Sequence, residues 1–286
     1  GATGWRLDCA NDLGRDACAD AARAARLAGA SDGVIGELMV WPVGWTRPGD
    51  GLDGVMNYWL RSTALALASG EAPAAQVQAA LDRLAAEMPL ADLLGSWNLL
   101  SSHDTPRLAT ILDGDAARIR LALALAFSYP GKPMIYYGEE IGMRGGADPA
   151  NRAGMIWDEA GWDRERLALV QSLCALRRSE PALMHGRYVP LPQPGTELVA
   201  FARVTDEPGE TVLFVGNAAA SAVQARIFVP LPFMLDALPL SDKLAPGKEA
   251  VKMEGGWLGL SLPPRGCALY QPVDDHPGGY RFFKRI

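Results

Sequence analysis

The sequence has few cysteines, few histidines and no long hydrophobic run. Its four cysteines, at positions 9, 18, 174 and 267, show neither zinc-finger nor thioredoxin spacing, so we expect four free thiols. The three histidines stand far apart, at positions 103, 185 and 276, which excludes a histidine-based metal motif. The longest apolar run is residues 121–127, whereas a bilayer span needs about 20 residues. We therefore expect no metal, no cofactor and no membrane-spanning segment.

Clusters of positive charge are also scarce. The 27 lysines and arginines are outnumbered by 33 aspartates and glutamates, and no basic cluster is longer than Arg177-Arg178. This balance argues against a nucleic-acid partner. Hydrophobic residues make up 49% of the 286 positions and charged residues 21%. Such a composition excludes a largely disordered chain and is enough for one or two globular domains.

The pattern of predicted elements changes near residue 182. Up to that point strands alternate with helices, which predicts a parallel sheet with helical crossovers. The expected strands are residues 3–8, 33–40, 54–57, 97–101 and 133–137, and the expected helices are 12–27, 58–68, 74–88, 115–127 and 162–179. After Pro181 the apolar runs shorten to strand length, which predicts an antiparallel all-β sandwich. Its expected strands are 198–204, 211–215, 223–229, 257–262 and 267–271. We thus predict an α/β domain over 1–182 and a β domain over 183–286.

Carboxylates stand at the ends of two predicted strands, where α/β barrels place their active sites. Arg6 and Asp8 are two residues apart on a strand and share a face, and a guanidinium keeps a neighbouring carboxylate ionised. That environment suits a nucleophile, although a plain strand-end ion pair has the same pattern. Glu37 ends an apolar strand, where burial can make a carboxylic acid a proton donor. A helix-capping or solvated glutamate is the alternative.

A third segment, residues 98–107, follows another strand and contains His103 and Asp104. These two side chains can bond adjacent hydroxyls of a sugar, and Asp104 can also cap the helix that Thr105-Pro106 begins. Paired carboxylates without metal ligands are typical of glycoside hydrolysis. Tryptophans that suit a sugar-stacking site, or simply a core, occur at 41, 45, 59, 97 and 157.

Taken together, these segments resemble the motifs of the α-amylase family of glycoside hydrolases. Its nucleophile, acid and third-carboxylate motifs are similar to residues 4–12, Gly36-Glu37 and 102–107, and a further match spans 130–143 and 145–152. The Ala10-Asn11-Asp12 extension and the loop of residues 145–149 most resemble the neopullulanase, cyclomaltodextrinase and maltogenic amylase branch. The resemblance implies strands four to eight of a (β/α)₈ TIM barrel followed by the β-sandwich.

The resemblance also implies roles for particular residues. Asp8 would be the nucleophile, Glu37 the acid and then the base, and Asp104 the stabiliser of the transition state. Arg6 would orient Asp8, and His103 would bond the sugar at the cleavage position. Further substrate-binding candidates are Asn11, Asp12, Trp41, Asp148 and Arg152. The substrates would be α-glucans, maltooligosaccharides or cyclodextrins, with α-1,4 and also α-1,6 bonds.

Some features depart from the family or stay open. The branch usually carries an aromatic residue two positions after the acid, where this chain has Met39 and only later Trp41. We expect the chain to begin at the fourth barrel strand, and to be inactive and prone to aggregate alone through the open edge of strand 3–8. Alternatives are an exo-acting α-glucosidase, a transglycosylase, a non-catalytic fragment, or a carbohydrate-binding module at 185–286. A homodimer of the parent protein is open, as is the compartment, with the cytoplasm favoured.

Overall fold

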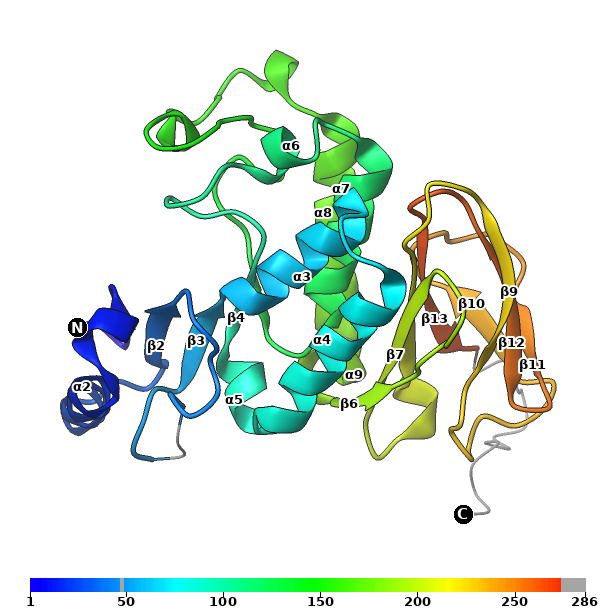
Figure 1. The fold of residues 1–286 in the computed structure, drawn as a ribbon, viewed down its shortest axis with the longest axis horizontal. Helices are drawn as coiled ribbons and strands as arrows, with labels where there is room; N and C mark the ends of the chain where they lie inside the picture. Colours follow the sequence, from blue (N-terminus) through cyan, green and yellow to red (C-terminus); the bar gives the residue numbers. More distant parts are fainter. Residues whose placement is uncertain (47–48, 274–286) are drawn as a thin grey trace.

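The computed structural model describes residues 1–46 and 49–273, and Figure 1 shows its elements along the chain. Residues 47–48, and residues 274–286 of the predicted second domain with His276, lie outside the described residues. The first half forms a five-stranded parallel sheet in the order β1-β2-β3-β4-β5. Its strands are β1 Gly4–Leu7, β2 Gly33–Leu38, β3 Gly54–Asn57, β4 Trp97–Leu99 and β5 Lys132–Met134. Helices connect these strands, except that the described residues between β2 and β3 form a loop. The parallel sheet with helical crossovers confirms the predicted partial barrel.

Strand alternation gives the sheet two different faces. Val34, Leu38 and Val55 point toward the helices and join the larger hydrophobic core. The opposite face carries a small cluster in which Ile35, Met56 and Leu99 meet Tyr58, Trp97 and Met134. Because Glu37 lies two residues after Ile35, its side chain is on this second face, the interior face of the sheet.

Three of the longer helices, α3, α7 and α8, begin at a residue whose side chain caps the first turn. Asn57 accepts a hydrogen bond from the Leu60 N–H at the start of α3, and Asp115 does the same for two N–H groups of α7. Helix α7 is buried over most of its length. The helices are α1 Ala10–Leu13, α2 Arg15–Leu27, α3 Tyr58–Ser69, α4 Ala74–Glu87, α5 Leu90–Gly95, α6 Leu108–Ile111, α7 Ala116–Ser128, α8 Arg164–Ser179 and α9 Pro181–His185, with short 3₁₀ turns at Ala150–Arg152, Glu159–Gly161 and Pro208–Glu210. Helices α1, α5 and α9 were not expected from the sequence, because each has at most six residues. Helix α6 begins at Leu108 with Arg107 at its N-cap, so Asp104 does not cap it.

Two glycines allow β3 to start directly beside the end of α5. A side chain built at Gly54 would lie 2.5 Å from the backbone carbonyl of Gly95. Any larger residue would force the two backbones apart. This contact sets the start of β3, and therefore the place where Tyr58 leaves the sheet.

The second half forms an eight-stranded antiparallel sheet in the order β6-β7-β8-β13-β10-β11-β12-β9. Its strands are β6 Arg187–Pro190, β7 Leu198–Val204, β8 Val212–Asn217, β9 Val223–Phe228, β10 Pro239–Asp242, β11 Val251–Glu254, β12 Trp257–Leu262 and β13 Cys267–Pro272. The inward residues of both ends of the sheet, among them Leu213, Ile227 and Leu258, form one core. The sheet therefore folds over itself, as the predicted all-β domain requires. Strands β6, β10 and β11 have only four residues each and were missed.

The two halves share a continuous apolar layer. Phe201 on β7 stacks on Phe214 of β8 with ring centroids 5.0 Å apart, and it also contacts Tyr129, which follows α7. Arg203 is fully buried in the same layer. It donates hydrogen bonds to the carbonyls of Gly186 and Ser128, at 2.8 and 2.7 Å. No helix in the described part of the chain is long and apolar enough to span a bilayer.

Candidate active site

Arg6 on β1 bonds two carboxylates. One guanidinium nitrogen pairs with Asp8, and another donates to Glu37 Oε1 at 2.5 Å. The Asp8 side chain is 72% exposed, whereas the Glu37 side chain is only 6% exposed. The hydrogen bond and charge of Arg6 hold the pKa of Asp8 below its usual value. Asp8 is therefore an accessible carboxylate that stays ionised.

The second oxygen of Glu37 is bonded to the backbone. Cys9 donates its N–H to Glu37 Oε2 at 3.0 Å. Cys9 adopts a left-handed conformation with φ of 46°, which turns the chain from β1 into α1. Glu37 is thus fixed from both sides, by Arg6 and by the turn that follows Asp8.

Asp104 lies in the loop after β4 and is held by neighbouring side chains. His103 Nε2 lies 2.9 Å from Asp104 Oδ2, and Arg152 Nη2 donates to Oδ1 at 3.2 Å. The Asp104 N–H donates to Ser102 Oγ at 3.1 Å. Arg152 also donates to the His103 carbonyl at 2.9 Å and pairs with Asp148 at 3.0 Å. The loop of residues 145–152 therefore fixes the Asp104 loop from outside the sheet.

Glu37 is the point where these groups meet. Donor atoms of Asp8, Cys9 and Glu37 lie within 4.8 Å of one another, and so do donor atoms of Glu37, His103 and Asp104. The three carboxylates singled out from the sequence thus lie close together, although they are up to 96 positions apart in the chain (104 − 8). We refer to Asp8, Glu37 and Asp104 as the carboxylate trio.

Other residues predicted for the site have contacts of their own. Asn11 and Asp12, on α1, bond to each other at 2.6 Å, and Asp12 is exposed to solvent. Trp41 donates its indole N–H to Glu87 at 3.1 Å and packs edge-on against Trp59, with centroids 4.6 Å apart. The described contacts of Trp41 are therefore with α3 and α4, and they leave its predicted stacking role a prediction.

Two residues near the trio were not expected. The Tyr58 hydroxyl lies 3.1 Å from Ser102 Oγ, because α3 begins directly where β3 ends. Glu139 is fully buried below the Asp104 loop and accepts a hydrogen bond from Ser101 Oγ at 2.5 Å. Burial raises the pKa of Glu139 to about 7. The position of Tyr58 at a strand end was a usable sequence signal, whereas the burial of Glu139 was not readable.

The trio lies close to the Cys9 thiol and the His103 imidazole, and these groups together offer ligand atoms for a cation. Arg6 already places a positive charge against two of the three carboxylates. A metal ion would have to displace that guanidinium or tolerate its repulsion. The electrostatics therefore favour a metal-free site, and the absence of a metal or cofactor stays a prediction.

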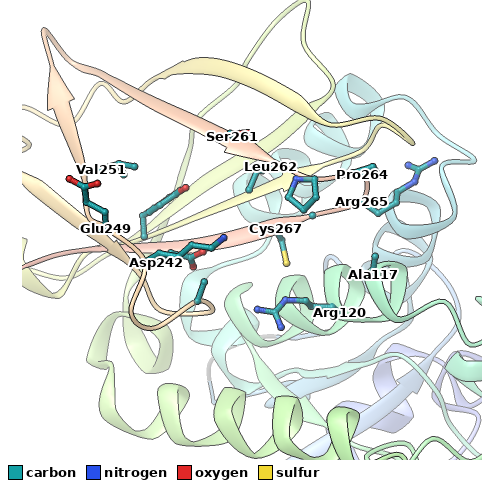
Figure 2. Close-up of a pocket in the computed structure, with 15 residues that line it drawn as sticks. Ala117, Arg120, Asp242, Glu249, Val251, Ser261, Leu262, Pro264, Arg265 and Cys267 are labelled. Atoms are coloured by element: carbon teal, nitrogen blue, oxygen red, sulfur yellow. The ribbon is translucent and has the colours of Figure 1, made fainter.

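A cavity lies far from this chemistry, at the boundary of the two halves. It has a volume of about 520 Å³ and lies between α7 and the β10–β13 region, as Figure 2 shows. Arg120 and Cys267 line it from opposite sides. Arg120 donates to the Leu244 carbonyl at 2.5 Å, which ties α7 to the second half. The trio does not line this cavity, so the cavity is not where we place the reaction.

Comparisons with known proteins point the same way as the motifs. The profile of the α-amylase catalytic domain matches residues 43–170. A cyclomaltodextrinase of Geobacillus thermopakistaniensis is 33% identical over 268 residues, which are 93% of this chain and 44% of that protein. Neopullulanase 2 of Thermoactinomyces vulgaris is 37% identical over 187 residues, 65% of this chain and 32% of that protein.

Solved structures give the same result. The native debranching enzyme of Nostoc punctiforme superposes with a TM-score of 0.81 at 30% identity, covering 95% of this chain and 58% of that one. The chain spans less than half the length of the two curated relatives.

Proposed function

The chain belongs to the α-amylase family of glycoside hydrolases, and from this premise we propose that it supplies the carboxylates for retaining hydrolysis of α-glucosidic bonds. The observation that carries the proposal is the convergence of Asp8 and Asp104 on Glu37, with donor atoms within 4.8 Å in each group. Retaining enzymes hold their two reacting carboxyl groups about 5–5.5 Å apart, so the close approach of Asp8 to Glu37 supports this choice.

In the proposed reaction, Asp8 attacks the anomeric carbon while the bond from that carbon to the leaving oxygen breaks. Glu37 gives its proton to that oxygen. Water then attacks the same carbon, Glu37 takes the water proton, and the Asp8 ester is released, so the configuration is retained. The lowered pKa of Asp8 keeps the nucleophile ionised. The ion pair with Arg6 suits the ionised Glu37 of the second step.

Asp104 and His103 have the role of binding sugar hydroxyls. Both carboxylate oxygens of Asp104 already have one partner each, His103 and Arg152, and each oxygen keeps a free lone pair. A carboxylate fixed in this way can bind ring hydroxyls without reorganising, which favours the transition state. Arg152 and Asp148 hold Asp104 in place in this proposal.

The proposed substrates are maltooligosaccharides, cyclodextrins and branched α-glucans. Relatives named cyclomaltodextrinase, neopullulanase and debranching enzyme support this class. The arrangement of the trio is the same for α-1,4 and α-1,6 bonds, so bond preference depends on groups around it.

The test is product analysis with maltotriose, pullulan and cyclodextrins. It uses residues 1–286 and the same chain extended by any open reading frame that precedes Gly1. We expect α-configured products by proton NMR, and a loss of at least about 1,000-fold in turnover for Asp8→Asn. Glu71→Gln, which changes an exposed residue just after α3, is the control. Inverted products, undiminished turnover by Asp8→Asn, or no turnover from either chain would refute the proposal.

A further inference from the structure

An exposed pair of aromatic rings lies on the second half of the chain, on strands β9 and β12. Trp257 is the cross-strand neighbour of Phe228, and their ring centroids are 5.2 Å apart with a 49° angle between the planes. The two residues remain 40% and 45% exposed. Large rings exposed side by side add little to the core, and such pairs commonly mark a binding surface.

The residues around the pair face solvent, and the position of Gly259 beside them is open. Leu258, Leu260 and Leu262 of β12 point into the core, so the residues between them point outward. Gly259 is one of these, and a side chain built there would meet no atom within 4 Å. Arg226 lies across from Gly259. We call the outward residues of these strands the β9–β12 face, which comprises Gln224, Arg226, Phe228, Trp257, Gly259 and Ser261.

Hydrogen-bonding groups of both signs flank the rings. The Arg226 guanidinium lies 5.9 Å from the centre of the Trp257 ring and 3.8 Å from the Glu254 carboxylate. Gln224 and Ser261 are exposed partners across the two strands. Mixed charges do not favour a strongly anionic or cationic ligand. An aromatic platform with neutral and paired polar groups suits a sugar, whose apolar C–H face stacks on a ring while its hydroxyls bond the rim.

The edge of β9 is protected against pairing with another strand. The Gln193 side chain donates to the Phe228 carbonyl and accepts from the Phe228 N–H, both at 3.1 Å. It therefore occupies the backbone groups that a second copy of the chain would need for strand addition at this point. The side-chain face, and not the strand edge, is what remains for a partner.

We propose that the β9–β12 face binds an α-1,4-linked glucan chain, separately from the carboxylate trio. In such a chain successive sugar rings are rotated against each other, so they can stack on two rings inclined by 49°. A flat β-1,4-linked chain needs nearly coplanar rings. Figure 1 places β9 and β12 at the opposite end of the long axis from β1 and α2. The choice of α-glucan also rests on the proposed function.

The test measures binding of residues 1–286 to maltoheptaose and to cellohexaose by titration calorimetry, and retardation in native gels that contain soluble starch. Trp257→Ala should weaken maltoheptaose binding at this surface at least about tenfold, because stacking supplies most of the contact. Gly259→Gln places a side chain in the open space at Gly259. It should obstruct glucan binding while leaving Phe228 and Trp257 unchanged. Leu235→Ala changes a residue that is 43% exposed and outside the face, and is the control.

The outcomes separate this proposal from the proposed function. Starch retardation that Trp257→Ala and Gly259→Gln both abolish supports the face, whether or not any bond is hydrolysed. Hydrolysis of a nitrophenyl maltoside should stay at the level of the parent chain in both variants. Unchanged retardation in both variants, or equal binding of cellohexaose, overturns the proposal. A dimer in sedimentation that Trp257→Ala dissolves, without glucan binding, also overturns it in favour of a second copy.

Discussion

Charged side chains are held differently at the carboxylate trio and in the layer between the barrel helices and the C-terminal sheet. At the trio, Arg6 forms ion pairs with Asp8 and Glu37, and the Asp8 side chain stays exposed. In the buried layer, the charged Arg203 donates hydrogen bonds to backbone carbonyl oxygens, and burial lowers its pKa to about 9. The first arrangement keeps carboxylates ionised and accessible, whereas the second fixes two elements and gives no access to a substrate.

The largest expected effect comes from breaking the trio at Glu37. Glu37→Gln keeps the size of the side chain and one acceptor oxygen, which can serve either Arg6 or Cys9, but it cannot transfer a proton. We expect turnover of maltooligosaccharides to fall by about 10²- to 10⁴-fold. With a nitrophenyl maltoside the bond-breaking step should fall far less, because that leaving group needs no proton. Initial rates on both substrates check this, and an equal loss on both would contradict the assignment of Glu37 as the acid.

Breaking the buried layer should instead affect stability. Arg203→Met leaves the carbonyls of Gly186 and Ser128 without donors, which we expect to lower the free energy of unfolding by about 2–3 kcal/mol. Arg23→Met removes an exposed arginine of α2 and should change it by at most about 0.5 kcal/mol. Urea unfolding followed by circular dichroism measures both. If Arg203→Met were as stable as Arg23→Met, the backbone contacts of Arg203 would not hold the two halves together.

Glu139 sharpens the comparison, since it is a buried acid next to the Asp104 loop. Its pKa is raised from 4.5 to about 7, so the folded protein holds a proton between these values that the unfolded chain has released. The stability from this group is complete below about pH 4.5 and is lost as the pH rises through 7. We expect Glu139→Gln, which keeps an oxygen for Ser101, to remove this loss, worth at most about 3 kcal/mol.

The measurement compares the free energy of unfolding at about pH 5 and about pH 8. The parent chain should lose stability between these conditions, and Glu139→Gln should lose less. Glu71→Gln, at an exposed position, is the control and should follow the parent chain. If the free energy of unfolding fell equally in all three proteins, Glu139 would be ionised in the folded protein throughout this pH range.

The features that could be predicted from the sequence are those that depend on residues close together in the chain. Two-residue periodicity placed Arg6 beside Asp8, and the strand-helix alternation predicted the parallel sheet. Contacts between distant segments could not be predicted. The packing of Trp41 on Trp59 and the burial of Glu139 are two examples. The roles of the trio remain predictions, which only activity measurements can test.

The smallest expected effect is a shift in the pH profile when Arg6 is changed. Asp8 must be ionised to attack, and Arg6 is the first cause of its pKa lying below 3.8. Arg6→Gln should therefore raise the pKa of Asp8 and move the acid limb of kcat/KM to higher pH. Arg6→Lys keeps a positive charge and should move the limb less. Initial rates between about pH 3 and pH 7 measure the limb. A limb that stays in place in Arg6→Gln while Arg6→Lys behaves identically would mean that Arg6 positions the trio without setting the ionisation of Asp8.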